Sequence, residues 1–423
     1  MKKDLLKTLL LDQSEQFKKK ELGVTRENLI QIKKYANSSY AVVISGLRRV
    51  GKSTLLAQIA HKFYSSDDYY FVNFEDERFL NFTADDFNLL YETQLEFFGQ
   101  RKIFLLDEVQ NVIGWERFVR RMIDEGCKFY ITGSNAALLS KELGTKLTGR
   151  YTPIELFPFS FAEFLAFKQQ KTPNLAYLTT LQKSKLKRYF NDYIVTGGIP
   201  DALKYPEINL HKTLYDDVIY RDVAVRYKIE ETKALKELSF YLISNISSLV
   251  SFNKLKELLK LGSVNTVKNY IDYLQTSWLM FTINKFAFSI KKQQIANKKI
   301  YAIDTGLIKS VAFSFSENRG KLLENLVFLT LRRLFEEIYY YTTQNDLEVD
   351  FYLPKQKILI QVCQSLADEE TQKREVKALI AAMQELNINS AVILTEDEDS
   401  VDFENGKIKV IPMFKWLLDP LNN

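Results

Sequence analysis

The chain has 423 residues, of which 46% are hydrophobic and 26% are charged. It is too long for one compact core and too apolar for a disordered chain, so we expect about two to four folded domains. Two cysteines and two histidines, with no clustering among them, exclude a disulfide framework and a zinc-ligand set. Because 58 basic residues stand against 53 acidic ones, a nucleic-acid role would have to rest on local patches rather than on bulk charge.

The N-terminal segment MKKDLLKTLLL begins like a signal peptide, but Asp4 and Lys7 interrupt its apolar run and no small-residue cleavage site follows. No stretch approaches the roughly 20 apolar residues that a membrane helix needs. We therefore expect a cytoplasmic protein with no membrane contact.

Short apolar runs alternate with longer amphipathic segments between about residues 39 and 156, which predicts a parallel sheet covered by helices. Residues 159–245 are mainly helical and are interrupted at Thr196–Pro200 by the sequence TGGIP, so a helical lid is expected there. Residues 246–288 predict two short helices and a strand. After residue 298 strands dominate, with one long helix near residues 373–386.

The sequence GLRRVGKST, residues 46–54, matches the phosphate-binding loop pattern and lies between an apolar strand and a helix, as that chemistry requires. Its glycines let successive backbone N–H groups point at phosphate oxygens, Lys52 reaches the β- and γ-phosphates, and Ser53 can hold Mg²⁺. The residues expected to bind the nucleotide in this loop are Gly46, Arg49, Gly51, Lys52, Ser53 and Thr54.

The segment KIFLLDEVQ places four apolar residues before Asp107 and Glu108, as in a buried strand that ends at a nucleotide pocket. Asp107 is expected to bind the Mg²⁺ shell, and Glu108 to orient and polarise the attacking water. Taken alone, the same acidic pair could simply cap a strand end.

With these two segments in place the sequence resembles the AAA+ branch of P-loop ATPases. In KFYITGSNA the resemblance implies that Ser134, or else Asn135, senses the γ-phosphate; an ordinary strand-end turn is the alternative. In LTGRYTPIEL it implies that Arg150 reaches the γ-phosphate of a neighbouring subunit, unless it is only a solvated charge. TGGIP is similar to an element that lies near the adenine, which implies nucleotide contact for Gly198 and Pro200, against a plain helix break.

The order of GLRRVGKST, DEVQ, TGS, TGRY and FPFSFAEF resembles a group of prokaryotic AAA-like ATPases with a C-terminal domain of unknown function. YAIDTGL, GKLLENLV and LEVDFYL, in residues 301–353, are similar to recurring segments of that domain. The resemblance implies an α/β fold, ATP and Mg²⁺ as cofactors, and a homo-oligomeric ring.

Residues 251–286 predict helix, tight turn, helix and strand, with Ser263 as the N-cap of the second helix. This is the anatomy of a winged helix-turn-helix, although such modules also serve as packing or protein-contact domains. One face of the second helix carries Asn265, Lys268 and Asn269, and the basic stretch KKQQIANKK, residues 291–299, follows. The candidate DNA contacts are Asn265, Lys268, Asn269, Lys291 and Lys292.

Glu324, Asp350 and the segment ILIQVC resemble a restriction-endonuclease-like core, whose active site needs a further Glu-x-Lys to hold Mg²⁺ and position water. Those two positions carry Gln361 and Cys363 here, so nuclease activity is not expected. Glu348, on the same side of the strand as Asp350, is the residue that could replace a ligand and restore it.

The expected domains are a P-loop AAA+ core at residues 1–157, a helical lid at 158–245, a winged helix at 246–297 and a degenerate nuclease-like α/β domain at 298–423. The leading hypothesis is an oligomeric Mg²⁺-dependent ATPase that couples ATP hydrolysis to DNA binding or remodelling. The alternative is a slow nucleotide-dependent switch that contacts a protein partner.

Overall fold

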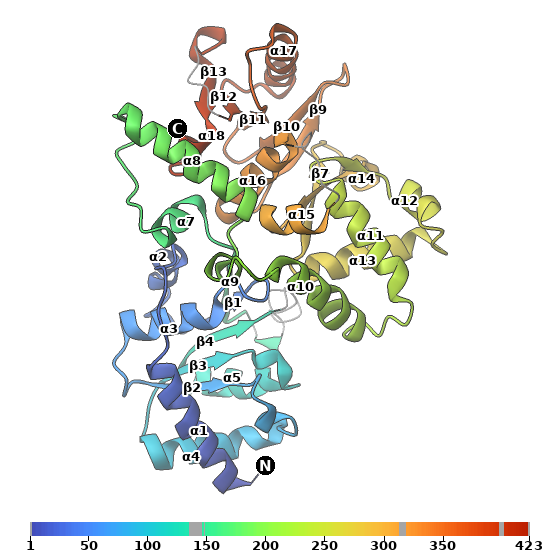
Figure 1. The fold of residues 1–423 in the computed structure, drawn as a ribbon. Helices are drawn as coiled ribbons and strands as arrows, with labels where there is room; N and C mark the ends of the chain where they lie inside the picture. The colour runs from blue at the N-terminus through green and yellow to red at the C-terminus, as the bar shows by residue number, and fades with distance from the viewer. Residues whose placement is uncertain (1, 135–145, 148, 313–318, 397–401, 422–423) are drawn as a thin grey trace. The chain divides into compact units, whose positions relative to one another are not determined.

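A computed structural model describes residues 2–134, 146–147, 149–312, 319–396 and 402–421. The chain divides into two compact units, Met1–Phe157 and Pro158–Asn423, and each has a hydrophobic core of its own (Figure 1). Asn135 lies outside the described residues.

The first unit is built on five parallel strands in the spatial order β2-β3-β4-β1-β5. These are β1 (Ala41–Ser45), β2 (Tyr69–Asn73), β3 (Ile103–Asp107), β4 (Lys128–Gly133) and β5 (Tyr151–Glu155). Strand β4 lies between β1 and β3 although it follows both in the chain, with Ser45 opposite Gly133 and Leu106 opposite Ile131. The carboxyl ends of β1, β4 and β3 are therefore neighbours, and the predicted parallel sheet is confirmed.

The helices of this unit bury apolar faces in an aromatic-rich core. They are α1 (Lys3–Lys18), α2 (Asn28–Lys33), α3 (Lys52–Phe63), α4 (Phe87–Phe98) and α5 (Trp115–Asp124), with 3-10 turns η1 (Glu77–Phe79), η2 (Ala84–Asp86) and η3 (Val109–Asn111). In α5 the residues Trp115, Phe118 and Met122 recur every three or four positions, so they share one buried face. Phe118 stacks on Phe87 with ring centroids 4.7 Å apart. Each fully buried aromatic side chain stabilises the fold by roughly 1.5–3 kcal/mol.

The second unit begins with helices, as its sequence predicts. They are α7 (Phe161–Phe167), α8 (Thr180–Thr196), α9 (Pro200–Lys204), α10 (Leu210–Asp217), the π-helical η5 (Val218–Val225) and α11 (Thr232–Ser244). Ser160 starts α7 with a capping box, in which its hydroxyl accepts from Glu163 N and the Glu163 carboxylate accepts from Ser160 N. Gly197 ends α8 and Pro200 begins α9, so TGGIP does break the helix.

Three further helices and three strands follow. They are β6 (Leu249–Val250), α12 (Phe252–Leu258), α13 (Val264–Thr276), β7 (Met280–Lys285), α14 (Ile290–Ile295) and β8 (Lys298–Ala302). The hydroxyl of Ser263 accepts a hydrogen bond from Thr266 N at 3.1 Å, so Ser263 caps α13 as predicted. Val267, Ile271 and Leu274 are buried along one face of α13 because they recur at helical spacing.

An eight-stranded sheet joins these strands to the C-terminal part in the order β13-β12-β11-β10-β9-β7-β8-β6. Its other strands are β9 (Tyr339–Thr342), β10 (Glu348–Leu353), β11 (Ile358–Val362), β12 (Ala391–Thr395) and β13 (Ile408–Pro412). The helices of this part are α15 (Thr305–Val311), α16 (Arg319–Leu334), α17 (Glu369–Leu386) and α18 (Met413–Trp416), with the 3-10 turn η7 (Glu404–Gly406). Because β7 and β8 pair as antiparallel neighbours, the domain boundary expected at residue 297 falls between two paired strands.

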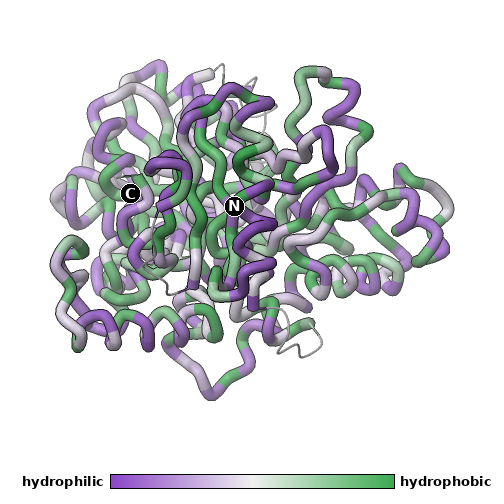
Figure 2. The backbone as a smooth tube through the Cα atoms, turned by 90° about the horizontal axis from the view of Figure 1, so that it is seen from above, coloured by the Kyte–Doolittle hydropathy of each residue, from purple (hydrophilic) through white to green (hydrophobic). Residues whose placement is uncertain are grey.

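Hydrophobic and hydrophilic stretches alternate along the helices (Figure 2), as expected of helices that cover sheets. In the described part of the chain, no helix combines the length and the apolar composition needed to cross a bilayer.

Candidate functional site

The loop after β1 has the backbone that its sequence predicts for a phosphate site. A Cβ atom on Gly46 would stand 2.2 Å from the carbonyl oxygen of Leu156, so only glycine fits there. Arg49 and Gly51 have φ values of 63° and 93°, which turn the chain into the first turn of α3, where Thr54 also lies. The N-terminal end of this 12-residue helix therefore faces the loop and favours an anion.

Lys52 is buried, and its ammonium group lies at the centre of the site. Its Nζ donates to the carbonyl oxygens of Gly46 and Leu47 at 3.2 and 3.3 Å. It also forms an ion pair with Glu108 Oε1 at 3.3 Å. These neutral carbonyl acceptors are weaker partners than phosphate oxygens would be.

Asp107 lies at the end of β3 and is almost fully buried. Its carboxylate accepts hydrogen bonds from the hydroxyls of Ser53 and Thr132. Burial raises the pKa of Asp107 above its ordinary value, and the two hydroxyls oppose that shift. The Ser53 hydroxyl and the Asp107 carboxylate thus form a pair of oxygen donors of the kind that Mg²⁺ prefers.

Glu108 adopts a left-handed backbone conformation with φ of 50° directly after β3. Its Oε2 accepts from Ser134 N at 3.2 Å and from the side-chain amide of Gln110. Burial alone would raise the pKa of Glu108, but the charge of Lys52 and the hydrogen bonds from Gln110 and Lys52 outweigh burial and lower it. The carboxylate is therefore held ionised, as a group that orients water must be.

Ser134 follows β4, which places it between the loop and the Asp107–Glu108 pair. Its side chain is 2% exposed, and its Oγ makes no hydrogen bond within the described residues. An unsatisfied buried hydroxyl costs free energy unless a ligand supplies the partner. Ser134, Lys52 and the Ser53–Asp107 pair together fit a nucleoside triphosphate with its magnesium ion.

Two residues missed in the sequence complete this site. Thr132 Oγ1 donates to Asp107 and accepts from Glu108 N at 3.1 Å, which fixes both acidic residues to β4. Arg26 is buried, and it donates to Val50 O of the loop at 2.7 Å and to Phe157 O at 2.6 Å. The sequence could have pointed to Thr132, because it lies near the end of the same apolar strand that Ser134 follows. Nothing in the sequence around Arg26 points to its role.

Arg150 precedes β5, as predicted, and forms an ion pair with Asp124. All five strands are parallel, so a residue before β5 lies at the edge of the sheet opposite the phosphate loop. Five strand residues span about 16 Å. Arg150 is therefore outside the reach of the nucleotide site of its own chain.

Gly198 and Pro200 were expected near the adenine. The structure places the Gly197–Gly198 pair in a tight joint within the second unit, where Gly198 N donates to Asp304 Oδ2 at 2.7 Å. A Cβ atom on Gly197 would stand 2.1 Å from Asp304 Oδ1, and one on Gly198 would stand 2.4 Å from Phe159 O. This packing explains why both positions are glycine, and no bound nucleotide is needed for that explanation.

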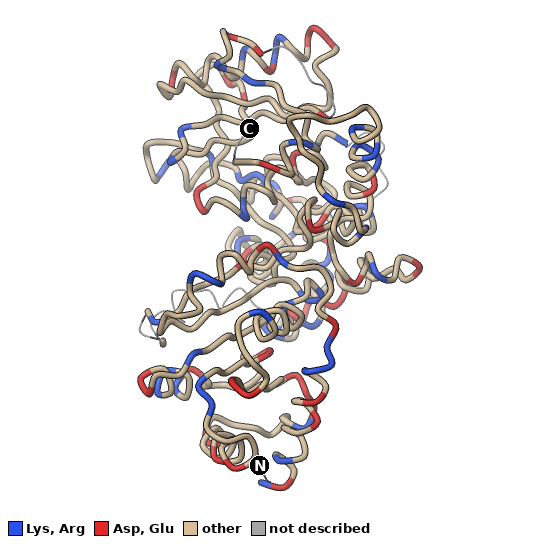
Figure 3. The backbone as a smooth tube through the Cα atoms, turned by 90° about the vertical axis from the view of Figure 1, so that its left-hand side faces the viewer, with Lys and Arg blue, Asp and Glu red and all other residues tan. Residues whose placement is uncertain are grey.

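The candidate DNA contacts lie on α13 and α14. Asn265, Lys268 and Asn269 are exposed on α13, and Lys291 and Lys292 are exposed on α14. Burial and the nearby charge of Lys268 lower the pKa of Lys298, the first residue of β8. Elsewhere, basic and acidic residues are interspersed along the chain (Figure 3).

The last lysine of the basic stretch corrects one expectation. Lys299 is 2% exposed, and its Nζ pairs with Glu324, Glu348 and Asp350, so it cannot contact a phosphate backbone. Lys299 also adds an ammonium group to the three acidic residues Glu324, Glu348 and Asp350, called the nuclease-like cluster below. The sequence predicted no ammonium group there.

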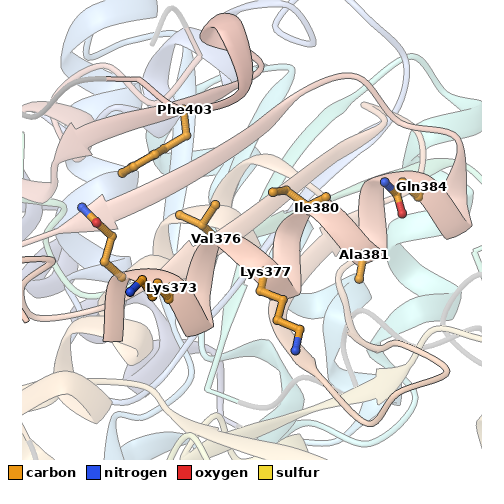
Figure 4. Close-up of a pocket in the computed structure, with 8 residues that line it drawn as sticks. Lys373, Val376, Lys377, Ile380, Ala381, Gln384 and Phe403 are labelled. Carbon is orange, nitrogen blue, oxygen red and sulfur yellow. The ribbon is translucent and has the colours of Figure 1, made fainter. Parts of the chain in front are cut away.

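The two positions expected to complete a nuclease site contact α17 instead. Gln361 Nε2 donates to Glu375 Oε2 of α17 at 2.6 Å. Cys363 is buried in the apolar cluster that includes Leu379 and Met383 of the same helix. The opposite face of α17 borders a pocket of about 430 Å³, where Val376 points toward Phe403 and Lys377 points away (Figure 4).

Comparison with known proteins identifies the domains by sequence. Residues 38–165 match an AAA domain, and residues 187–318 and 319–416 match two domains of unknown function, DUF8612 and DUF4143. An uncharacterized protein of Methanocaldococcus jannaschii, MJ1544, is 36% identical over 438 residues, which cover 99% of this chain and 96% of that protein. An uncharacterized protein of Haemophilus influenzae is 30% identical over 73% of this chain and 79% of its own.

Among solved structures, the match with the Aeropyrum pernix ORC1 protein in complex with DNA covers 68% of this chain and 92% of the ORC1 chain. The sequence identity is 12% and the TM-score is 0.31. The AAA-domain match contains the phosphate loop, Asp107, Glu108 and Ser134, and the match with MJ1544 covers 99% of this chain. The chain therefore belongs to the family of AAA-like P-loop ATPases that carry C-terminal domains of unknown function.

Proposed function

We propose that this protein binds ATP with Mg²⁺ and hydrolyses it as an oligomer, and that its nucleotide state controls DNA contact by the second unit. The observation that carries the proposal is the meeting of Lys52, Asp107, Glu108 and Ser134 at the carboxyl ends of neighbouring strands.

Each residue has a separate task in this proposal. Lys52 exchanges the carbonyl oxygens of Gly46 and Leu47 for the β- and γ-phosphates. Loss of the Lys52 contact frees Glu108 Oε1 to accept a proton or hydrogen bond from the attacking water. The buried hydroxyl of Ser134 donates a hydrogen bond to the γ-phosphate. Magnesium, held by Ser53 and Asp107, would neutralise charge on the phosphate oxygens.

The test separates binding from turnover. Lys52→Ala should abolish ATP binding, because it removes the cationic partner of the phosphates, whereas Glu108→Gln should bind ATP and lose at least about 10²-fold in turnover. Lys62→Ala on the exposed side of α3 and the exposed Glu77→Gln are the matched controls. If Glu108→Gln hydrolyses ATP within about twofold of the parent, its proposed role is wrong.

The DNA part is tested by phosphate release with duplex, single-stranded and branched DNA. Stimulation of several-fold is expected if nucleotide turnover and DNA contact are coupled. Slow turnover that no DNA changes would favour a switch that contacts a protein.

A further inference from the structure

Three acidic side chains of the second unit converge on one ammonium group. Lys299 Nζ lies 2.8 Å from Glu324 Oε1, 2.8 Å from Glu348 Oε1 and 2.8 Å from Asp350 Oδ1. The lysine comes from β8, Glu324 from α16, and the other two from β10. A lysine ammonium has three N–H donors, so each carboxylate can take one of them.

The cluster is buried and tied to its surroundings. The side chains of Lys299, Asp350 and Glu324 are 2%, 9% and 11% exposed, and only Glu348, at 36%, reaches the surface. The Tyr301 hydroxyl donates to Glu324 Oε1 at 2.7 Å, and Asp350 Oδ2 accepts from Val362 N at 2.9 Å. Glu324 and Asp350 are therefore each held by a group outside the ion cluster.

We propose that the Lys299 ammonium is a built-in cation that occupies the place of a divalent metal ion among Glu324, Glu348 and Asp350. Carboxylates that converge in a buried place repel one another, so a cation must hold them together. The three oxygens stand 2.8 Å from the nitrogen, whereas oxygen ligands lie at 2.0–2.1 Å from Mg²⁺ and 2.3–2.6 Å from Ca²⁺. The spacing of the three oxygens thus suits an ammonium group.

The assignment also accounts for the missing Glu-x-Lys positions. With the cation supplied by β8, the carboxylates stay together without a metal, and Gln361 is free to bond with Glu375 instead. The nuclease-like cluster then has no metal with which to activate water.

The inference predicts that removal of Lys299 creates a divalent-cation site. Nucleotide-free Lys299→Ala protein should bind Tb³⁺, used as a Ca²⁺ probe, with emission sensitised through Tyr301. Its Tm should rise by at least about 3 °C with Ca²⁺ and less with Mg²⁺, because the larger ion needs less contraction of the site. The wild type should show neither effect at this cluster.

Matched variants isolate the site. Lys299→Arg keeps the positive charge and should gain no cation affinity, and adding Asp350→Asn to Lys299→Ala should abolish the gained emission and Tm shift. A folded Lys299→Ala protein without either gain would overturn the proposal.

Two measurements keep the test decisive if Lys299→Ala does not fold. Lys299→Met with Glu324→Gln fills the volume and removes one charge, and it should fold better with Ca²⁺ than with EDTA. In the wild type, EDTA should leave the Tm unchanged; a fall that Asp350→Asn removes would show that a metal already occupies the cluster, and the inference would be wrong.

Discussion

Gln361 lies between two acidic residues of the second unit, and its amide satisfies both sides. Its Nε2 donates to Glu375 Oε2 at 2.6 Å, and its Oε1 accepts from Asp350 N at 3.2 Å. Both Gln361 and Glu375 are more than nine-tenths buried. A neutral amide meets both demands, because it donates and accepts at once, whereas an ionised carboxylate can only accept.

Gln361→Glu should lower the free energy of unfolding by about 2–4 kcal/mol at pH 7, since it removes the donor to Glu375 and buries a second carboxylate beside it. The like-charge pair has a raised pKa in the folded state. The destabilisation is therefore present at high pH and is relieved as the pH falls through that raised value. Urea unfolding at pH 5 and pH 8 measures this, with Gln384→Glu on the exposed side of α17 as the control. An equal loss at both pH values would contradict the explanation.

Among the elements, α13 and α14 carry the proposed DNA contact. They offer exposed lysines and asparagines but no arginine for bidentate guanine contacts, so phosphate contacts should dominate. Lys268, Lys291 and Lys292 are the residues to change, and the buried Lys299 is excluded.

The triple variant Lys268→Ala, Lys291→Ala and Lys292→Ala should weaken binding about equally on unrelated DNA sequences and reduce the dependence of log K on log[salt] by up to about 2–3. Fluorescence anisotropy at several salt concentrations measures both. Replacing Lys355, Lys373 and Lys377 by Ala removes the same charge from exposed positions elsewhere. Equal losses of DNA affinity in both triple variants would show that only the net charge matters. Unchanged DNA affinity in the first triple variant would mean that α13 serves packing rather than DNA contact.

The TGGIP segment also packs against the turn between β8 and α15, where Gly198 N donates to Asp304. Gly198→Ala should lower the free energy of unfolding by about 2–4 kcal/mol, because its Cβ would stand 2.4 Å from Phe159 O. Gly320→Ala in α16 is the control, since its Cβ would meet no atom within 4 Å and alanine favours helix. Unchanged stability with weakened ATP binding would instead support adenine contact by Gly198.

At the scale of the whole molecule, the role proposed for Arg150 would link activity to oligomerisation. Because it lies at the edge of the sheet opposite its own phosphate loop, it can reach a γ-phosphate only in another subunit. Arg150→Ala should keep ATP affinity and lose roughly 10³-fold in turnover.

Mixing Arg150→Ala with Glu108→Gln protein tests this arrangement, because each lacks a different half of a shared site. Mixed interfaces should recover part of the activity. An active monomeric wild type, with no recovery at any mixing ratio, would rule out the subunit-to-subunit role.

The sequence by itself determined the P-loop fold and most of the residues of the proposed nucleotide site. Gly46 to Thr54 are contiguous, and Asp107, Glu108 and Ser134 each follow an apolar strand, so local pattern is enough to place them at one edge of a parallel sheet. The expected α/β fold is confirmed for the same reason.

Only the tertiary structure decided the role of Lys299, which local composition had grouped with surface lysines. Its partners lie 25, 49 and 51 positions away in the chain, and no periodicity encodes such distances. The Gly198–Asp304 joint and the Arg26 contacts with Val50 and Phe157 likewise join distant segments. Strand order and packing bring these groups together. A buried charged or polar group is stable only beside a partner, so these contacts form only in the folded chain.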